Sequence, residues 1–98
     1  METFQQLIQS NTPVLVDFYA DWCGPCKAMA PVIKETVADL HGKARVIKID
    51  IDKNKLVAQQ YLIKSVPTFI IFKKGAAIWR HSGMIDKNTL TKQLLSFA

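Results

Sequence analysis

The stretch Trp22-Cys23-Gly24-Pro25-Cys26 stands where a strand pattern gives way to a helical one. Before it, Val14–Tyr19 (VLVDFY) is rich in β-branched and aromatic residues, which predicts a buried central strand. After it, apolar residues recur at helical spacing, which predicts a helix from Cys26 to about Leu40. Pro25 suits the first helical turn, because the amide hydrogens there have no intrahelical acceptor. The stretch is therefore a strand-to-helix turn.

Both cysteines of the chain lie in this turn. A thiol at a helix N-terminus meets unpaired amides and the positive end of the helix dipole, which favour the thiolate over the thiol. We therefore predict that Cys23 is an exposed nucleophile and that Cys26, one helical turn further on, is the resolving thiol. Their spacing suits the ~4.4–6.8 Å between Cα atoms that a disulfide tolerates. Gly24 leaves the approach to Cys23 unhindered.

The composition is that of one ordinary globular domain spanning residues 1–98, with 49% hydrophobic and 21% charged residues. The net charge of +5 is spread along the chain without a dense basic run, so we expect no nucleic-acid partner. No apolar run approaches the ~18 residues of a membrane span, so we expect no membrane partner. The first residues form neither a basic nor an apolar signal region. A cytoplasmic protein is expected, or a periplasmic one if a signal peptide was removed.

The rest of the chain alternates between helical and strand patterns, with no repeat or linker. Period-two alternation predicts one further strand before residue 53, and a hairpin spacing predicts two antiparallel strands after Pro67. The predicted elements are a capped helix Thr3–Ser10, a strand Val46–Asp52, a helix carrying Leu56, Val57 and Tyr61, strands Thr68–Lys73 and Ile78–Ser82 joined by residues 74–77, and a last helix capped by Asp86. We expect His81 to be an exposed strand-end residue.

Four motifs occur together in a characteristic order: Asp17–Lys27 (DFYADWCGPCK), Asp50-Ile51-Asp52, Val66-Pro67-Thr68, and the Lys74-Gly75 turn followed by Gly83. In that order and spacing the chain resembles the thioredoxin family over almost all its length. The resemblance implies an α/β fold with a central mixed sheet of four or five strands flanked by helices. Only two or three residues precede the first helix, where the family has a strand. We therefore expect four strands, with Val46–Asp52 at an edge that its charges protect, and a monomer.

The resemblance also implies an activity, that of a protein-disulfide reductase. Its dithiol attacks disulfides in substrate proteins and is restored by thioredoxin reductase, and no cofactor or metal binds the chain itself. In the family pattern a cis bond precedes Pro67, and the backbone of Val66 offers an edge to an extended substrate segment. The substrate groove comprises Trp22, Gly24, Pro25, Ile51, Val66, Pro67, Gly83 and Met84. Tyr19 and Ser65 stand where the family usually has tryptophan and glycine, so the packing of the groove can differ.

Asp17 lies inside the buried strand pattern. Burying an ionised carboxylate costs several kcal/mol, so the pKa of Asp17 should be raised unless a positive charge is near, and Lys48 is the candidate. The resemblance places such an aspartate and lysine behind the inner cysteine, where the carboxylate can accept the Cys26 proton. The alternative is a solvated aspartate at the end of a strand.

The two cysteines allow other interpretations. A four-residue disulfide loop constrains little of the unfolded chain, which disfavours a purely structural bond. Cys23, Cys26 and His41 fit three ligands of a zinc finger, but the fourth position falls on Arg45, Val46 or Ile47, none of which binds zinc. Two other functions stay open on the same fold. One is a thiol oxidase or isomerase of secreted proteins, and the other is a binding module that uses the groove without turnover.

Overall fold

The computed structural model describes residues 2–98, in which helices and strands alternate along the chain. No helix in this range is long and apolar enough to cross a membrane. The elements are α1 (Phe4–Leu7), β1 (Val14–Tyr19), α2 (Gly24–Asp39), β2 (Arg45–Asp50), α3 (Lys55–Gln60), β3 (Thr68–Lys73), β4 (Ala76–Ser82) and α4 (Lys87–Ser96).

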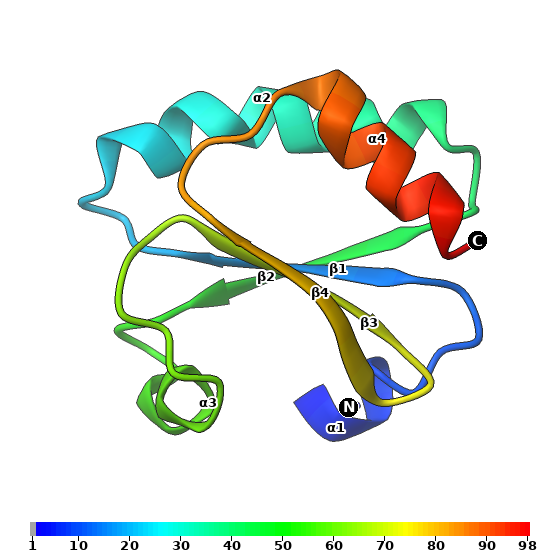
Figure 1. Ribbon diagram of the computed structural model, residues 1–98. Helices are drawn as coiled ribbons and strands as arrows, with labels where there is room; N and C mark the ends of the chain where they lie inside the picture. The colour runs from blue at the N-terminus through cyan, green and yellow to red at the C-terminus, as the bar shows by residue number, and fades with distance from the viewer. Residues whose placement is uncertain (1) are drawn as a thin grey trace.

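The strands of the described chain form one four-stranded sheet in the order β2-β1-β3-β4 (Figure 1). β1 pairs in parallel with β2 and antiparallel with β3, and β3 pairs antiparallel with β4. The predicted mixed sheet of four strands is therefore confirmed, with β1 in its interior. The central place of β1 explains why its sequence is nearly continuously apolar, since both of its faces are covered.

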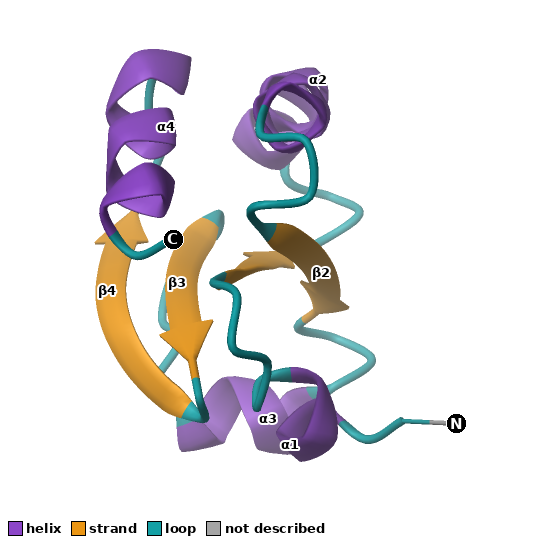
Figure 2. Cartoon of the chain, turned by 90° about the vertical axis from the view of Figure 1, so that its right-hand side faces the viewer, coloured by secondary structure: helices purple, strands orange, loops and turns teal. Residues whose placement is uncertain are grey.

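Helices cover both faces of the sheet (Figure 2). α2 and α4 lie on one side, and α1 and α3 lie on the other. Successive residues of β1 point to opposite faces, so Leu15 joins the core under α2 and α4, whereas Val14, Val16 and Phe18 join the core on the α1 and α3 side. Asp17 and Tyr19 share the parity of Leu15, which directs both side chains toward the α2 side.

Several bounds differ from the sequence prediction. The first helix ends at Leu7 rather than Ser10, and β2 ends at Asp50 rather than Asp52. The hairpin turn is Lys74-Gly75 alone, so β4 begins at Ala76 rather than Ile78, and a bulge in the β3–β4 pairing at Ile71/Phe72 accommodates the added residues. In β2, residues on the face opposite Ile47 and Ile49 are partly covered as well. Val46 packs against the core, and the Asp50 side chain is buried.

β2 lies at an edge of the sheet in the described chain. The amides of Arg45 and Ile51 donate to carbonyls of the β1 segment, those of Pro13 and Tyr19, at 3.0 Å each. Amides alternate in direction along a parallel strand, so Val46, Lys48 and Asp50 point their N–H groups away from β1. These three residues present the outer row of backbone donors.

This geometry predicts alternating amide protection along β2. In hydrogen–deuterium exchange followed by NMR, Val46 and Lys48 should exchange at least about tenfold faster than Ile47 and Ile49, because only the latter two donate to β1. The interior strand β1 is the internal control and should be slow throughout. Uniformly slow exchange along β2 in a verified monomer would contradict an uncovered edge.

Candidate active site

The two cysteines lie at the first turn of α2. Cys23 is the N-cap residue, and its Sγ accepts a hydrogen bond from the Cys26 amide at 3.1 Å. The two residues form a disulfide with their Cα atoms 5.3 Å apart. Pro25 occupies the first turn of α2 as predicted. The prediction that Cys23 is exposed is wrong for this disulfide form, since Cys23 is 4% and Cys26 7% exposed. Exposure therefore does not distinguish the two sulfurs, whereas the capping hydrogen bond does.

Two loops pack against the disulfide, and a third is joined to one of them. Ile51 and Val66 pack against the cluster formed by Ala20 and the two cysteines. The Sγ of Cys23 lies 3.6 Å from the Val66 carbonyl oxygen, a van der Waals contact here because a disulfide sulfur carries no proton. The Val66–Pro67 bond is cis, as the family resemblance implied. The Gly83 amide donates to the Pro67 carbonyl at 2.8 Å, which joins the β4–α4 loop to this group.

The rim of the site is exposed and apolar. Trp22 is 69% and Met84 56% exposed, and Gly24 and Pro25 are also at the surface. The indole Nε1 of Trp22 donates to Asp52 Oδ2 at 2.9 Å, so the large ring is fixed despite its exposure. Asp52 belongs to the Asp50-Ile51-Asp52 motif, but it is not among the site residues predicted from the sequence. The signal that it belongs there is the indole N–H, which needs an acceptor.

His81 was expected to be a solvated strand-end residue, and the structure places it differently. Its ring is half-buried and stacks on Trp79, with centroids 6.0 Å apart and planes at 8°. Its Nε2 lies 3.0 Å from the Met84 carbonyl oxygen, within hydrogen-bond distance. His81 therefore contacts the backbone of the loop that carries Met84. No pattern in the sequence predicts this contact.

Asp17 is only 2% exposed, so the solvated strand-end interpretation is wrong. Its Oδ1 has no hydrogen-bond partner among the described residues. Burial raises the pKa of the Asp17 carboxyl to about 6, and the charge of Lys48 partly opposes this shift. Lys48 is the register partner of Asp17 across β1 and β2, which places the two residues side by side in the sheet.

Lys48 also faces the inner cysteine. Its Nζ lies 4.8 Å from the centroid of the Tyr19 ring, a cation–π contact. A cavity of about 170 Å³ is lined by Tyr19, Cys26, Lys27 and Lys48, among others. The structure thus brings Lys48 and Cys26 to the same opening, beside the side of β1 that carries Asp17.

This arrangement is suited to one class of chemistry. A disulfide bond caps a helix, one of its sulfurs accepts an amide hydrogen bond, and an apolar rim surrounds it. No group of three or more potential metal-ligating side chains occurs within residues 2–98. Fold and site together define a domain for thiol–disulfide exchange with other proteins.

Comparisons with known proteins specify the family. The family profile described as thioredoxin matches residues 1–96. Thioredoxin 1 of Nostoc sp. is 46% identical over 90 residues, covering 92% of this chain and 84% of the relative. Chloroplastic thioredoxin Y of Oryza sativa is 45% identical over 95 residues, covering 96% of this chain and 56% of the relative. The crystal structure of the oxidised form of mitochondrial thioredoxin 3 from Saccharomyces cerevisiae matches this chain with a TM-score of 0.83 and 32% identity. The match covers 95% of this chain and 86% of that one.

The chain therefore belongs to the thioredoxin family, and it is a thioredoxin-type protein disulfide reductase with a Cys-X-X-Cys active site. Its redox pair is Cys23–Cys26.

The buried Asp17 predicts a specific pH dependence of stability. Its carboxyl titrates at about 6 when folded and near 3.8 when unfolded, so the folded state holds the proton more tightly. The resulting stabilisation is fully present below pH 3.8 and is lost as the pH rises through about 6. A shift of this size corresponds to about 3 kcal/mol in the free energy of unfolding.

Asp17→Asn should therefore raise the free energy of unfolding at pH 8 by up to about 3 kcal/mol and change it little at pH 4. Urea unfolding of the disulfide form at both pH values measures this, with exposed Asp21→Asn as the matched control. A variant that is no more stable than the parent at pH 8 would contradict the assigned burial.

Proposed function

We propose that Cys23 is the attacking thiol of this reductase and Cys26 the resolving thiol. In the dithiol form the Cys23 thiolate attacks a substrate disulfide, forming a mixed disulfide and releasing one substrate thiolate. Cys26, deprotonated, then attacks Cys23 Sγ, which closes the Cys23–Cys26 bond and releases the second substrate thiolate. The observation that carries this assignment is the 3.1 Å hydrogen bond from the Cys26 amide to Cys23 Sγ. A donor aimed at one sulfur stabilises negative charge on that sulfur in particular.

The substrate groove follows from the surfaces beside Cys23. An extended segment of the substrate pairs with the Val66 backbone, whose carbonyl oxygen lies 3.6 Å from Cys23 Sγ. Its apolar side chains lie on the exposed rim of the site. The groove residues are Trp22, Gly24, Pro25, Ile51, Val66, Pro67, Gly83 and Met84.

Asp17 accepts the proton of Cys26 during resolution. A carboxyl with a pKa raised to about 6 is ionised near neutral pH yet basic enough to take a thiol proton. Lys48 supplies the nearby positive charge and lines the opening beside Cys26. The proton passes through a water molecule in that opening.

The partners are disulfide-containing substrate proteins and a thioredoxin reductase, which returns two electrons and two protons to the Cys23–Cys26 bond. The chain works as a monomer without a cofactor or metal of its own, binds neither nucleic acid nor membrane, and acts in a reducing cytoplasm. The bacterial relative at 46% identity and the reductase chemistry support this assignment. Reduction of insulin disulfides by the protein with thioredoxin reductase and NADPH tests it, and no turnover would refute the proposal.

The thiol roles predict different trapping behaviour. Cys26→Ser should accumulate a stable mixed disulfide with a protein substrate, because attack survives while resolution is lost. Cys23→Ser, the matched control, should trap at least about tenfold less under the same conditions. Non-reducing electrophoresis with mass spectrometry quantifies the adducts. Equal trapping by the two variants would contradict the assignment of Cys23 as the attacking thiol.

The role of Asp17 predicts a slower second step. Asp17→Asn should release substrate from the mixed disulfide about tenfold to a hundredfold more slowly near pH 7, because the buried proton acceptor is gone. Stopped-flow fluorescence of Trp22 and Trp79 follows the step, and Asp21→Asn serves as control. If Asp17→Asn releases substrate at the parental rate, Asp17 is not the proton acceptor and affects only the stability of the fold.

A further inference from the structure

The chain between Asp52 and Asp86 contains no acidic residue but six basic ones. This segment includes α3, β3 and β4. Three of the six, Lys53, Lys55 and Lys64, lie within or beside α3, and all three are exposed. The surface around α3 therefore carries three exposed lysines against one exposed carboxylate, that of Asp52, which accepts the Trp22 indole hydrogen bond.

The same surface carries two strongly exposed leucines. Leu56 is 81% and Leu62 67% exposed, comparable with the 69% of Trp22 at the active site. Leu56, Gln59 and Leu62 follow one another at intervals of three, which places them along one side of the helix and its end. Gln59, Leu62 and Lys64 line one hollow of about 280 Å³, so apolar and basic groups are adjacent.

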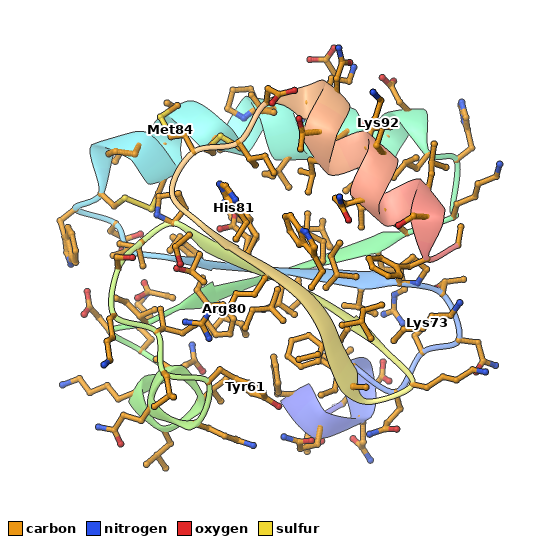
Figure 3. All side chains as sticks on the ribbon, in the orientation of Figure 1. Tyr61, Lys73, Arg80, His81, Met84 and Lys92 are labelled. Carbon is orange, nitrogen blue, oxygen red and sulfur yellow. A yellow bond between two sulfur atoms is a disulfide. The ribbon has the colours of Figure 1, made fainter. Side chains whose placement is uncertain are left out.

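Leu62 is held in an unfavourable backbone conformation. Its φ is +53°, in the left-handed region where a side chain is strained and glycine is preferred. The guanidinium of Arg80 donates to the carbonyl oxygens of Tyr61 and Leu62, the latter at 2.8 Å, and fixes this turn. Figure 3 labels the side chains of Arg80 on β4 and of Tyr61 at the end of α3. The exposed Leu62 side chain gains little from burial in the fold, so it is free to contact a partner.

The segments on both sides of α3 contact the active site. α3 is preceded by Asp52, which accepts the Trp22 indole hydrogen bond, and is followed by Val66, which contacts Cys23. In Figure 1, α3 and the N-terminal end of α2 lie at the same end of the sheet. A substrate bound in the groove extends over α3 if its segment continues past the disulfide.

We propose that Lys53, Lys55, Leu56, Leu62 and Lys64, here called the α3 patch, dock a substrate segment rich in leucine-like and acidic side chains beside the substrate disulfide. The inference rests on the proposed function and names its substrate class. Carboxylates pair with the three lysines, and apolar side chains cover the two leucines. The charge complementarity accelerates encounter with acidic partners at low ionic strength, while the leucines slow dissociation.

Three synthetic peptides test this class directly. Each contains the same disulfide loop followed by eight residues that alternate leucine with glutamate, glutamine or lysine. At low salt, kcat/KM of the parent protein should fall about tenfold from the glutamate to the lysine peptide, and the difference should shrink in ~0.5 M salt. Failure to reduce the glutamine peptide would refute the proposed function itself. Reduction of all three at equal rates would refute the docking inference alone.

Two double variants with the same change in net charge test whether the peptide preference comes from the α3 patch or from the net charge of the protein. Lys53→Glu with Lys55→Glu should remove the preference for the glutamate peptide, and acidic residues at a helix N-terminus do not oppose folding. Lys43→Glu with Lys92→Glu changes the net charge equally from exposed positions outside the patch and should keep the preference. Equal loss in both double variants would overturn the inference.

Leu62→Gly tests the apolar component. Glycine fits the backbone at φ +53°, so the melting temperature should rise or stay constant while kcat/KM for the glutamate peptide falls about threefold. An unchanged kcat/KM would remove Leu62 from the docking surface. Tighter binding of the protein to vesicles of anionic lipid than to the glutamate peptide would assign the α3 patch to membranes instead.

Discussion

The hydrogen bond from the Cys26 amide to Cys23 Sγ is the interaction on which the site depends. It exists because α2 begins immediately after Cys23, and α2 begins there because β1 ends at Tyr19 and the chain turns over the sheet. Burial of β1 between two helical layers fixes that turn, and Pro25 preorganises the first helical residues. The fold thus places the amide of Cys26, which has no acceptor within the helix, within hydrogen-bond distance of Cys23 Sγ.

The same burial that fixes β1 makes Asp17 unfavourable when ionised. Its side chain lies on the α2 side of the sheet, and Oδ1 finds no hydrogen-bond partner in the described chain. An apolar residue at this position would give a more stable sheet. The ionised carboxyl therefore lowers the stability of the fold, a cost that the proposed role of Asp17 as proton acceptor for Cys26 would explain. The raised pKa of Asp17 is the property that this proposed proton transfer requires.

Much of this architecture could be predicted from sequence because its signals are local. The apolar run of β1, Pro25 at the start of α2 and the capping box of Thr3 and Gln6 each specify backbone geometry within a few residues. Contacts across the fold were not predictable in the same way. The bond from Trp22 to Asp52 spans 30 residues, and the stacking of His81 on Trp79 depends on the pairing of β4. The low exposure of Cys23 was also missed, because Val66 covers it from a distant loop.

The central claim is that the start of α2 makes Cys23 the reactive thiol, and alkylation of the fully reduced protein tests it most directly. Mass spectrometry after brief exposure to iodoacetamide at pH 7 gives the rate at each cysteine separately. The account predicts that Cys23 reacts at least about tenfold faster than Cys26, with a rate that reaches half its maximum below pH ~8.5, the ordinary range of a free thiol. Equal rates at the two cysteines, rising together only above pH ~8.5, would contradict it.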